Sequence, residues 1–167
     1  YNDHIGKKKS PIVDTWWQTE TGGILISPLP NITPTIPTYA SLPLPGIQPC
    51  LMDEKGKEIT ENQIDGRLCI KYPWPSIART IWGNQQRYKE NDFYAYKNKY
   101  FTGDGALRNT IGYYRITGRV DDVIIVSGHN LGTAPIEDVI NEHPAVAESA
   151  IVGFPHDVKG NALYGYV

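Results

Sequence analysis

Residues 116–122 read Ile116-Thr117-Gly118-Arg119-Val120-Asp121-Asp122, and the character of the sequence changes across them. Before this stretch, from residue 46 onward, short apolar runs alternate with turn residues, which is typical of short β-strands. After it, an apolar run is followed by a segment with helical spacing and then by further strand-like runs. The sequence therefore predicts an α+β chain, with a boundary at 118–122 between a β-rich part and an α+β part.

The β-rich part is expected to contain several short strands. They are predicted over residues 48–52, 66–72, 100–101 and 113–117. The turn sequence at 53–56 predicts a hairpin after the first of them. Short strands separated by turn residues favour a small barrel or sandwich. Residues 76–99 are polar and aromatic, and their pattern assigns no element.

The N-terminal part is expected to be extended. Seven prolines fall between residues 28 and 49. Proline fixes φ and lacks an N–H, so this stretch is predicted to be neither helix nor central strand. Its apolar residues suggest that it packs down onto the rest of the molecule. A short strand is expected earlier, at residues 11–14.

Beyond the boundary, a loop over 127–132 is predicted to lead into a helix. Thr133 is a plausible cap, Pro135 suits the first turn, and Pro144 ends the helix. One helical face collects Ile136, Val139, Ile140 and His143. Strands are expected over 123–126, 147–154 and 164–167.

Composition excludes several classes of protein. A formal net charge of −2 disfavours nucleic-acid binding, and the lysines at 7–9 are read as a solvated turn. No apolar run reaches the ~20 residues that a membrane helix needs, and no signal peptide is evident. Cys50 and Cys69 lie in apolar stretches outside any C-x-x-C pair, which predicts buried free thiols and a cytoplasmic setting.

The densest chemical signal is the run from Asp14 to Gly23. It combines hydroxyls, an amide and a carboxylate with two indoles and a glycine pair. Hydroxyls and backbone N–H groups can bind phosphate, glycines allow close approach, and a carboxylate can hold Mg²⁺. The residues alone fit equally well a strand end and turn with two core tryptophans.

Two further signals follow it. Asp104 stands between two glycines, where its carboxylate can accept from both hydroxyls of a ribose or simply occupy a turn. The third signal is the 116–122 stretch together with the Ser-Gly-His sequence at 127–129.

In order and spacing, these motifs resemble those of the AMP-forming acetyl-CoA synthetases, in the adenylate-forming acyl-CoA synthetase superfamily. The matching stretches are residues 16–23 (WWQTETGG), 100–105 (YFTGDG), 116–122 (ITGRVDD) and 126–134 (VSGHNLGTA). The resemblance implies the end of a large N-terminal domain over 1–45 and a barrel-like subdomain over 46–118. It further implies a hinge over 119–122 and the start of a small α+β C-terminal domain over 123–167.

The family makes acetyl-AMP and diphosphate from acetate and Mg·ATP, then transfers the acetyl group to coenzyme A. The resemblance therefore implies a ligase whose partners are acetate, ATP, Mg²⁺ and coenzyme A. By motif match, the ATP site would include Asp14, Thr15, Trp16, Trp17, Gln18, Thr19, Asp104, Arg119 and Asn130. Trp16 would lie near the adenine, Thr19 at the α-phosphate, and Asp104 at the ribose.

Other roles are implied in the same way. Trp17 would wall the acyl pocket and Glu20 would bind Mg²⁺. Asp121 would be the hinge residue, and Ser127 with Gly128 would face coenzyme A. A structural cation would be held at Asn141, His143 and Val146. Asn130 departs from the arginine of many relatives and offers a neutral amide in place of a cationic fork.

No catalytic residue is assigned in this chain, because the family's phosphate loop and catalytic lysine have no match in it. The chain is therefore expected to be inactive alone. One alternative is a synthetase for propionate or another short acid. Another is a non-catalytic β-rich binding module, which four tryptophans and eleven tyrosines would suit.

Overall fold

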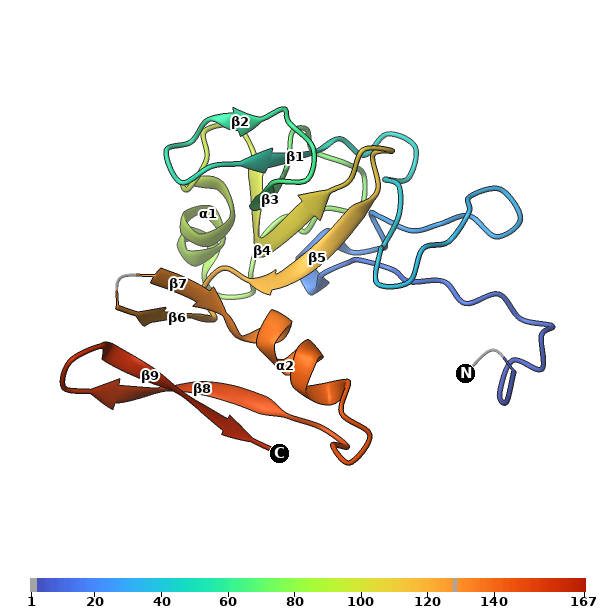
Figure 1. Cartoon of the computed structure of the whole chain (residues 1–167). Coiled ribbons are helices and arrows are strands. Elements are labelled where there is room, and N and C mark those ends of the chain that lie inside the picture. The colour runs from blue at the N-terminus through green and yellow to red at the C-terminus, as the bar shows by residue number, and fades with distance from the viewer. Residues whose placement is uncertain (1–2, 128) are drawn as a thin grey trace. The chain divides into compact units, whose positions relative to one another are not determined.

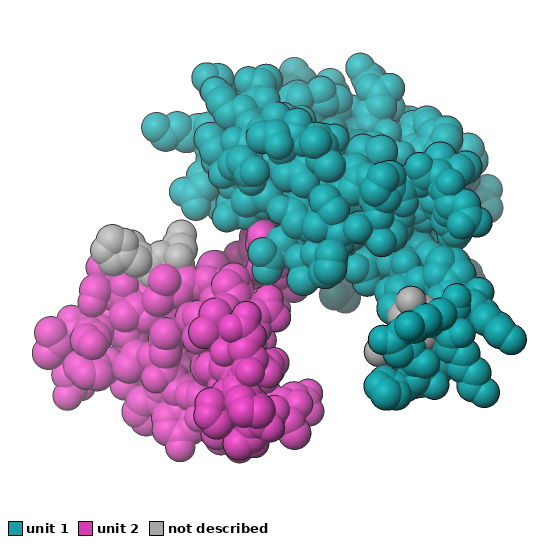
Figure 2. Space-filling model, turned by 45° about the vertical axis from the view of Figure 1, so that its right-hand side comes forward, with its two compact units in different colours: residues 1–102, 106–116 teal, residues 103–105, 117–167 magenta. Residues whose placement is uncertain are grey.

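The computed structural model describes residues 3–127 and 129–167, with the backbone alone for Ile125, His129 and Asn130. The elements are shown in Figure 1. The chain divides into two compact units, coloured in Figure 2. Unit 1 comprises the residues up to 102 together with 106–116, and unit 2 comprises 103–105 and 117–167.

A five-stranded sheet runs through the β-rich part in the order β2-β1-β3-β4-β5. Its strands are β1 (Pro49–Met52), β2 (Glu58–Ile59), β3 (Asp65–Ile70), β4 (Tyr100–Arg108) and β5 (Tyr114–Arg119). The predicted hairpin joins β1 to β2. Its turn is closed by Asp53, whose Oδ1 accepts from the N–H groups of Lys55 and Lys57 at 2.9 and 2.8 Å. Strands β1, β3 and β5 lie where the sequence predicts them, with ends shifted by one or two residues. Strand β4 starts as predicted but continues to Arg108, well beyond the predicted end at residue 101.

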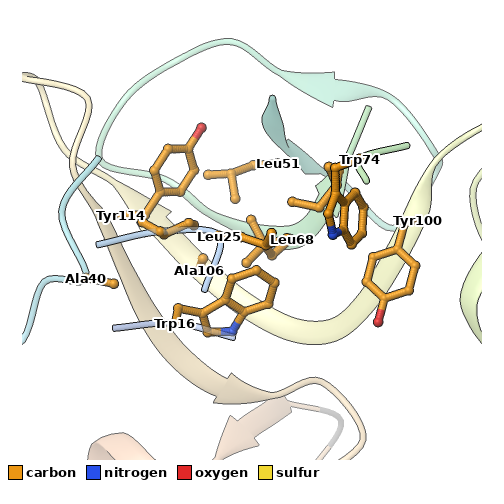
Figure 3. Packing of buried hydrophobic residues seen from close by; sticks show 11 residues of the cluster. Trp16, Leu25, Ala40, Leu51, Leu68, Trp74, Tyr100, Ala106 and Tyr114 are labelled. Carbon is orange, nitrogen blue, oxygen red and sulfur yellow. The ribbon is translucent and has the colours of Figure 1, made fainter. Parts of the chain in front are cut away.

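The core of unit 1 forms where this sheet meets the segments before it. Figure 3 shows Leu25 and Leu68 at its centre, with the rings of Trp16, Trp74 and Tyr114 around them. Trp16 pairs with Ile26 in an isolated antiparallel bridge, and Ile26 pairs in turn with Pro43. The proline-rich connection therefore packs against the core, as its apolar residues suggest. Residues 28–48 form neither a helix nor a named strand, whereas the last proline, Pro49, begins β1.

Helix α1 (Gln85–Phe93) lies in the stretch that the sequence leaves unassigned. Asn84 caps it, because its side-chain oxygen accepts from the N–H of Arg87 at 3.0 Å. Tyr88 is its buried residue. The rings of Tyr88 and Phe93 meet edge to face at 5.3 Å, and Phe93 meets Tyr100 at 5.8 Å. Aromatic contacts therefore hold α1 to the start of β4.

Unit 2 is built on a second, four-stranded sheet in the order β7-β6-β9-β8. Its strands are β6 (Val123–Val126), β7 (His129–Gly132), β8 (Ala150–His156) and β9 (Gly160–Tyr166), and its helix is α2 (Thr133–Asn141). Glu137 ties α2 to β8: its Oε1 accepts from the N–H of Ile151 at 2.7 Å.

The α+β, β-rich class is confirmed, and the described residues contain the helices α1 and α2. Residues 11–14 are not a strand, since this segment has no ladder partner. Residues 129–132 are a strand and not a loop, because Leu131 pairs with Ile124. Helix α2 includes Thr133 and starts after Gly132 as its N-cap. It ends at Asn141, before Pro144.

The final strand, β9, begins at Gly160, four positions before the predicted start. Residues 160–163 already pair with β8: Gly160 lies opposite His156, and Leu163 lies opposite Gly153. Cys50 and Cys69 are buried free thiols, as predicted. Neither helix in the described part of the chain is long and apolar enough to cross a bilayer.

Candidate functional site

The run from Trp16 to Gly23 folds into a tight 3₁₀ turn, η1 (Thr19–Thr21). The Thr21 hydroxyl is central to it, because its oxygen accepts from the N–H of Gln18 at 2.9 Å. The same oxygen lies 2.8 Å from the carbonyls of Gln18 and Gly23, either of which can accept its proton. Gly22 ends the turn in the left-handed region, at φ 66°. Thr21 therefore serves the shape of the turn, with its side chain turned inward.

Gln18 connects this turn to β4. Its Nε2 donates to the carbonyl of Thr102 at 2.7 Å, and its Oε1 accepts from the hydroxyl of Tyr100 at 2.9 Å. The first two sequence motifs, more than 80 residues apart, are thus joined inside unit 1. Both ends of the amide are used within the protein, so Gln18 contributes to the site by fixing its frame.

The two tryptophans lie in opposite environments. Trp16 is 6% exposed and belongs to the core, whereas Trp17 is 56% exposed. An extended backbone sends successive side chains to opposite faces. The reading of both residues as core tryptophans is therefore wrong for Trp17, and Trp17 is the member of the pair whose ring can face a ligand.

The surface of the turn carries oxygen-bearing side chains. Asp14, Thr15 and Thr19 are exposed and Glu20 is half-buried. The pKa of Tyr88 is raised mainly by burial. The negative charges of Asp92 and Glu20 raise it further, to a lesser extent. Within the described residues, the Glu20 carboxylate has no hydrogen bond or ion pair. Carboxylate and hydroxyl oxygens are ligands that suit Mg²⁺, so the donor set at this turn fits that ion.

A segment that the sequence did not single out contacts the same turn. Trp74 Nε1 donates to the carbonyl of Thr21 at 3.0 Å, and the Ser76 hydroxyl donates to the same oxygen at 2.7 Å. The N–H of Ala78 donates to the carbonyl of Glu20 at 2.8 Å. We call residues 74–78 the strut. Its only signal in the sequence is the group Trp-Pro-Ser, which by itself predicts no contact.

In unit 2, Arg119 lies between two carboxylates. Its Nε and Nη2 donate to Asp121 Oδ1 and Oδ2 at 2.9 and 3.0 Å. Its Nη1 lies 3.6 Å from Asp104 Oδ1, and the side chain of Asp104 is only 10% exposed. The hydrogen bonds from Arg119 lower the pKa of Asp121, and the same bonds raise the pKa of Arg119. A carboxylate paired in this way stays ionised at neutral pH.

Gly103 makes room for this arrangement. Its φ is 73°, and a Cβ there would lie 2.6 Å from Arg119 Nη2. The guanidinium therefore lies directly against the backbone beside Asp104. The structure brings together the predicted residues Asp104, Arg119 and Asp121.

The remaining predicted residues lie elsewhere in unit 2. Ser127 is exposed, in the left-handed region at φ 50°. Gly128 lies outside the described residues, as does the side chain of Asn130, whose backbone pairs with Ile125. Asn141 is the last residue of α2, and His143 lies two residues beyond it.

His143 closes the end of the helix. Its Nδ1 accepts from the N–H of Ala145 at 3.2 Å, and its carbonyl accepts from the N–H of Val146 at 2.9 Å. No cluster of three or more His, Cys, Asp or Glu side chains suited to a metal occurs among the described residues. A cation at Asn141, His143 and Val146 would thus depend on main-chain carbonyls.

Comparison with known proteins agrees with the motifs. Residues 135–167 match the family described as "AMP-binding enzyme C-terminal domain". The whole chain is 55% identical to the acetyl-coenzyme A synthetase of Syntrophobacter fumaroxidans and 56% identical to that of Caulobacter vibrioides. In both cases it covers 26% of the relative. The chain thus spans about a quarter of the length of the curated relatives it matches.

A solved structure of lower sequence identity also matches nearly the whole chain. The ATP-bound RpMatB-BxBclM chimera B3 matches 94% of this chain with a TM-score of 0.81 and 26% identity, and the chain covers 30% of that protein. The resemblance indicated by the motifs, to part of an acetyl-CoA synthetase in the adenylate-forming superfamily, is confirmed.

Proposed function

We propose that this chain is a segment of an AMP-forming acetate–CoA ligase, which converts acetate, ATP and coenzyme A into acetyl-CoA, AMP and diphosphate. One observation carries the proposal. The ordered motifs stand in a chain that is 55% identical, along its full length, to part of an acetyl-coenzyme A synthetase. We call the longer protein that this match implies the parent.

The reaction has two steps. An acetate oxygen attacks the α-phosphorus of ATP and diphosphate leaves, which forms acetyl-AMP. The coenzyme A thiol then attacks the acetyl carbonyl and AMP leaves. Both steps depend on the positioning of charged groups, which protein side chains and backbone dipoles supply.

Unit 1 would carry the phosphate and acyl parts of the site. Thr19 would donate to the α-phosphate, beside the exposed Asp14 and Thr15. Glu20 would hold Mg²⁺, which would offset phosphate charge. The fit of oxygen donors at the η1 turn supports this assignment. Trp17 would wall the acyl pocket, and its exposed ring supports that role. Trp16 would lie near the adenine, and Gln18 would line the ATP site while its bonds to β4 fix the turn.

Unit 2 would carry the ribose and coenzyme A parts. Asp104 would accept from both ribose hydroxyls with Arg119 beside it, a role supported by the ionised pair that they form. Asp121 would be the hinge residue. Ser127 and Gly128 would face coenzyme A, with Asn130 near the nucleotide. Asn141, His143 and Val146 would hold a structural cation.

The domain assignment follows from the same resemblance. Residues 1–45 would end the large domain, 46–118 would form its barrel-like subdomain, 119–122 the hinge, and 123–167 the start of the C-terminal domain. The change of unit after residue 116 supports a boundary in this region.

Acetate-dependent exchange of labelled diphosphate into ATP, measured with the purified parent, tests the proposal. Exchange with acetate, followed by thioester formation on adding coenzyme A, is the expected result. Stronger exchange with propionate or butyrate than with acetate would show that the parent activates a longer acid. If the parent binds a ligand without needing a nucleotide and shows no exchange with any acid, the alternative of a non-catalytic β-rich binding module is favoured.

Asp104→Ala in the parent tests the ribose assignment separately. The change removes charge-assisted hydrogen bonds, which are worth about 1.5–3 kcal/mol. Exchange should weaken strongly with ATP and less with 2′,3′-dideoxy-ATP. Equal losses with both nucleotides would show that the ribose is not the partner of Asp104.

A further inference from the structure

We propose that the strut, residues 74–78, is a positioning element for the proposed phosphate and magnesium end of the site. In this proposal the Ser76 hydroxyl fixes the orientation of the turn that presents Thr19 and Glu20. The inference rests on the proposed function and adds Ser76 and Trp74 to it.

The strut fixes two successive peptide groups of the turn. The Thr21 carbonyl accepts from both Trp74 Nε1 and Ser76 Oγ, at 3.0 and 2.7 Å, which uses both of its lone pairs. The Glu20 carbonyl accepts from Ala78 N–H at 2.8 Å. A peptide plane held at its carbonyl cannot rotate without breaking these bonds. The direction in which the Glu20 side chain leaves the backbone is therefore set by the strut.

Close packing at Gly22 adds a second constraint. A Cβ on Gly22 would lie 2.1 Å from the carbonyl oxygen of Ser76, which is a backbone atom. Gly23 leaves more room, since its Cβ would meet Ser76 Oγ at 3.6 Å. The strut therefore lies against the face of the turn at Gly22, and it contacts the turn through packing as well as hydrogen bonds.

The strut is itself fixed by contacts with β4 and α1. Trp74 is buried and meets Tyr100 edge to face at 5.3 Å. Tyr100 is also the residue that donates to Gln18. On the other side, the Tyr88 hydroxyl of α1 donates to the carbonyl of Ala78. The strut is thus anchored to β4 and to α1, and both anchors are independent of Ser76.

Ser76 is the residue that can be changed cleanly. It is exposed, so Ser76→Ala removes one hydroxyl without opening a cavity in the core. Loss of one hydrogen bond of ordinary strength corresponds to about a fivefold change in an equilibrium constant. In the parent, we expect Ser76→Ala to raise KM for Mg·ATP and the half-saturating Mg²⁺ concentration by about that factor. KM for acetate should change by less than about twofold, since the acyl wall is a different residue.

The matched variants separate positioning from folding. Ser76→Thr keeps the hydroxyl and should restore both values. Thr80→Ala removes a hydroxyl two residues beyond the strut. Among the described residues this hydroxyl donates to the neighbouring carbonyl of Ile81, so its loss should leave both values unchanged. Trp74→Phe removes the second donor to Thr21 and keeps an aromatic ring. It should raise the same constants, and thermal melts of every variant report folding.

Glu20→Gln, measured in parallel, distinguishes this inference from the assignment of Glu20. If Glu20→Gln leaves the Mg²⁺ dependence unchanged, Glu20 is not the metal ligand. The inference about the strut then depends on KM for Mg·ATP alone. If Ser76→Ala leaves KM for Mg·ATP unchanged, or raises both KM values alike with a lower melting temperature, the strut has no positioning role and the inference is overturned.

Discussion

At the residue scale, the adjacent tryptophans show what a motif can and cannot predict. The pair predicts an acetate-type site through the resemblance, but the residue types do not say which ring faces outward. That depends on the bridge between Trp16 and Ile26, which directs the Trp16 ring into the core. The structure therefore adds a core role for Trp16, and its contact with the adenine stays a prediction.

Trp17→Gly in the parent tests the acyl wall. A buried methylene is worth only about 0.8 kcal/mol, so attraction alone cannot reject a longer acid and steric exclusion must do so. We expect lower kcat/KM with acetate and higher kcat/KM with butyrate or valerate. Trp16→Gly is the contrasting variant, expected to lower stability by about 3–5 kcal/mol as a large-to-small core change. A folded Trp17→Gly protein that still rejects four-carbon acids would refute the assignment.

At the element scale, turn chemistry predicted more than hydrophobic pattern did. The β1–β2 hairpin is predicted by Asp53 and the glycine of its turn. Helix α1 was missed because its sequence is polar, with Tyr88 as its buried residue. Strand β7 was missed because its asparagine and glycine have low strand propensity, and its pairing with β6 overrides that preference. The strut was missed because its contacts join residues more than 50 positions apart.

Gly22→Ala, measured in this chain, tests the packing of the strut on the η1 turn. Gly46→Ala is a matched control, because Gly46 also has a positive φ, 89°, but has no atom within 4 Å of its Cβ position. The control should cost about 1–2 kcal/mol for the left-handed backbone. Gly22→Ala should cost more, since it adds a clash with Ser76. Equal losses in urea unfolding would mean that the turn and the strut do not pack closely.

The pairing of β1 with β3 places Cys50 opposite Cys69, and alkylation can report it. Burial raises the pKa of Cys50 to about 11, and burial also raises the pKa of Cys69. Both thiols should therefore resist iodoacetamide at pH 8 in the folded chain and react at once in denaturant. Rapid labelling of the native chain would contradict the burial of the two thiols.

The same burial gives stability a pH dependence. An unfolded thiol ionises near its ordinary pKa of 9.0, whereas the folded Cys50 ionises near 11. The unfolded state therefore holds fewer protons between these values, so the contribution of Cys50 is present below pH 9 and falls as pH rises toward 11. Cys50→Ala should flatten this part of the pH profile of urea unfolding.

At the scale of the whole molecule, the residues proposed for the nucleotide are distributed over both units. Gln18, Thr19 and Glu20 belong to unit 1, whereas Asp104 and Arg119 belong to unit 2. The resemblance predicted which residues to examine, because motif order survives in the sequence. It could not predict that the Gln18 side chain bonds to β4, or that Arg119 binds both Asp121 and Asp104. Those contacts depend on distances that only the folded chain defines.

The isolated chain should therefore show no acetate-dependent ATP–diphosphate exchange. It spans about a quarter of the relatives' length. The phosphate loop and catalytic lysine that the resemblance implies for the parent have no match in its sequence. Catalysis of this type needs several charged groups held together around one phosphorus, and effective molarities of about 10⁵–10⁸ M are lost when they are not. Exchange measured with the purified chain, beside the parent as positive control, checks this. An Asp104→Ala chain prepared in the same way controls for contaminating host enzyme, since contamination would be equal in both samples. Exchange that the Asp104→Ala change abolishes would show that this segment suffices for adenylation.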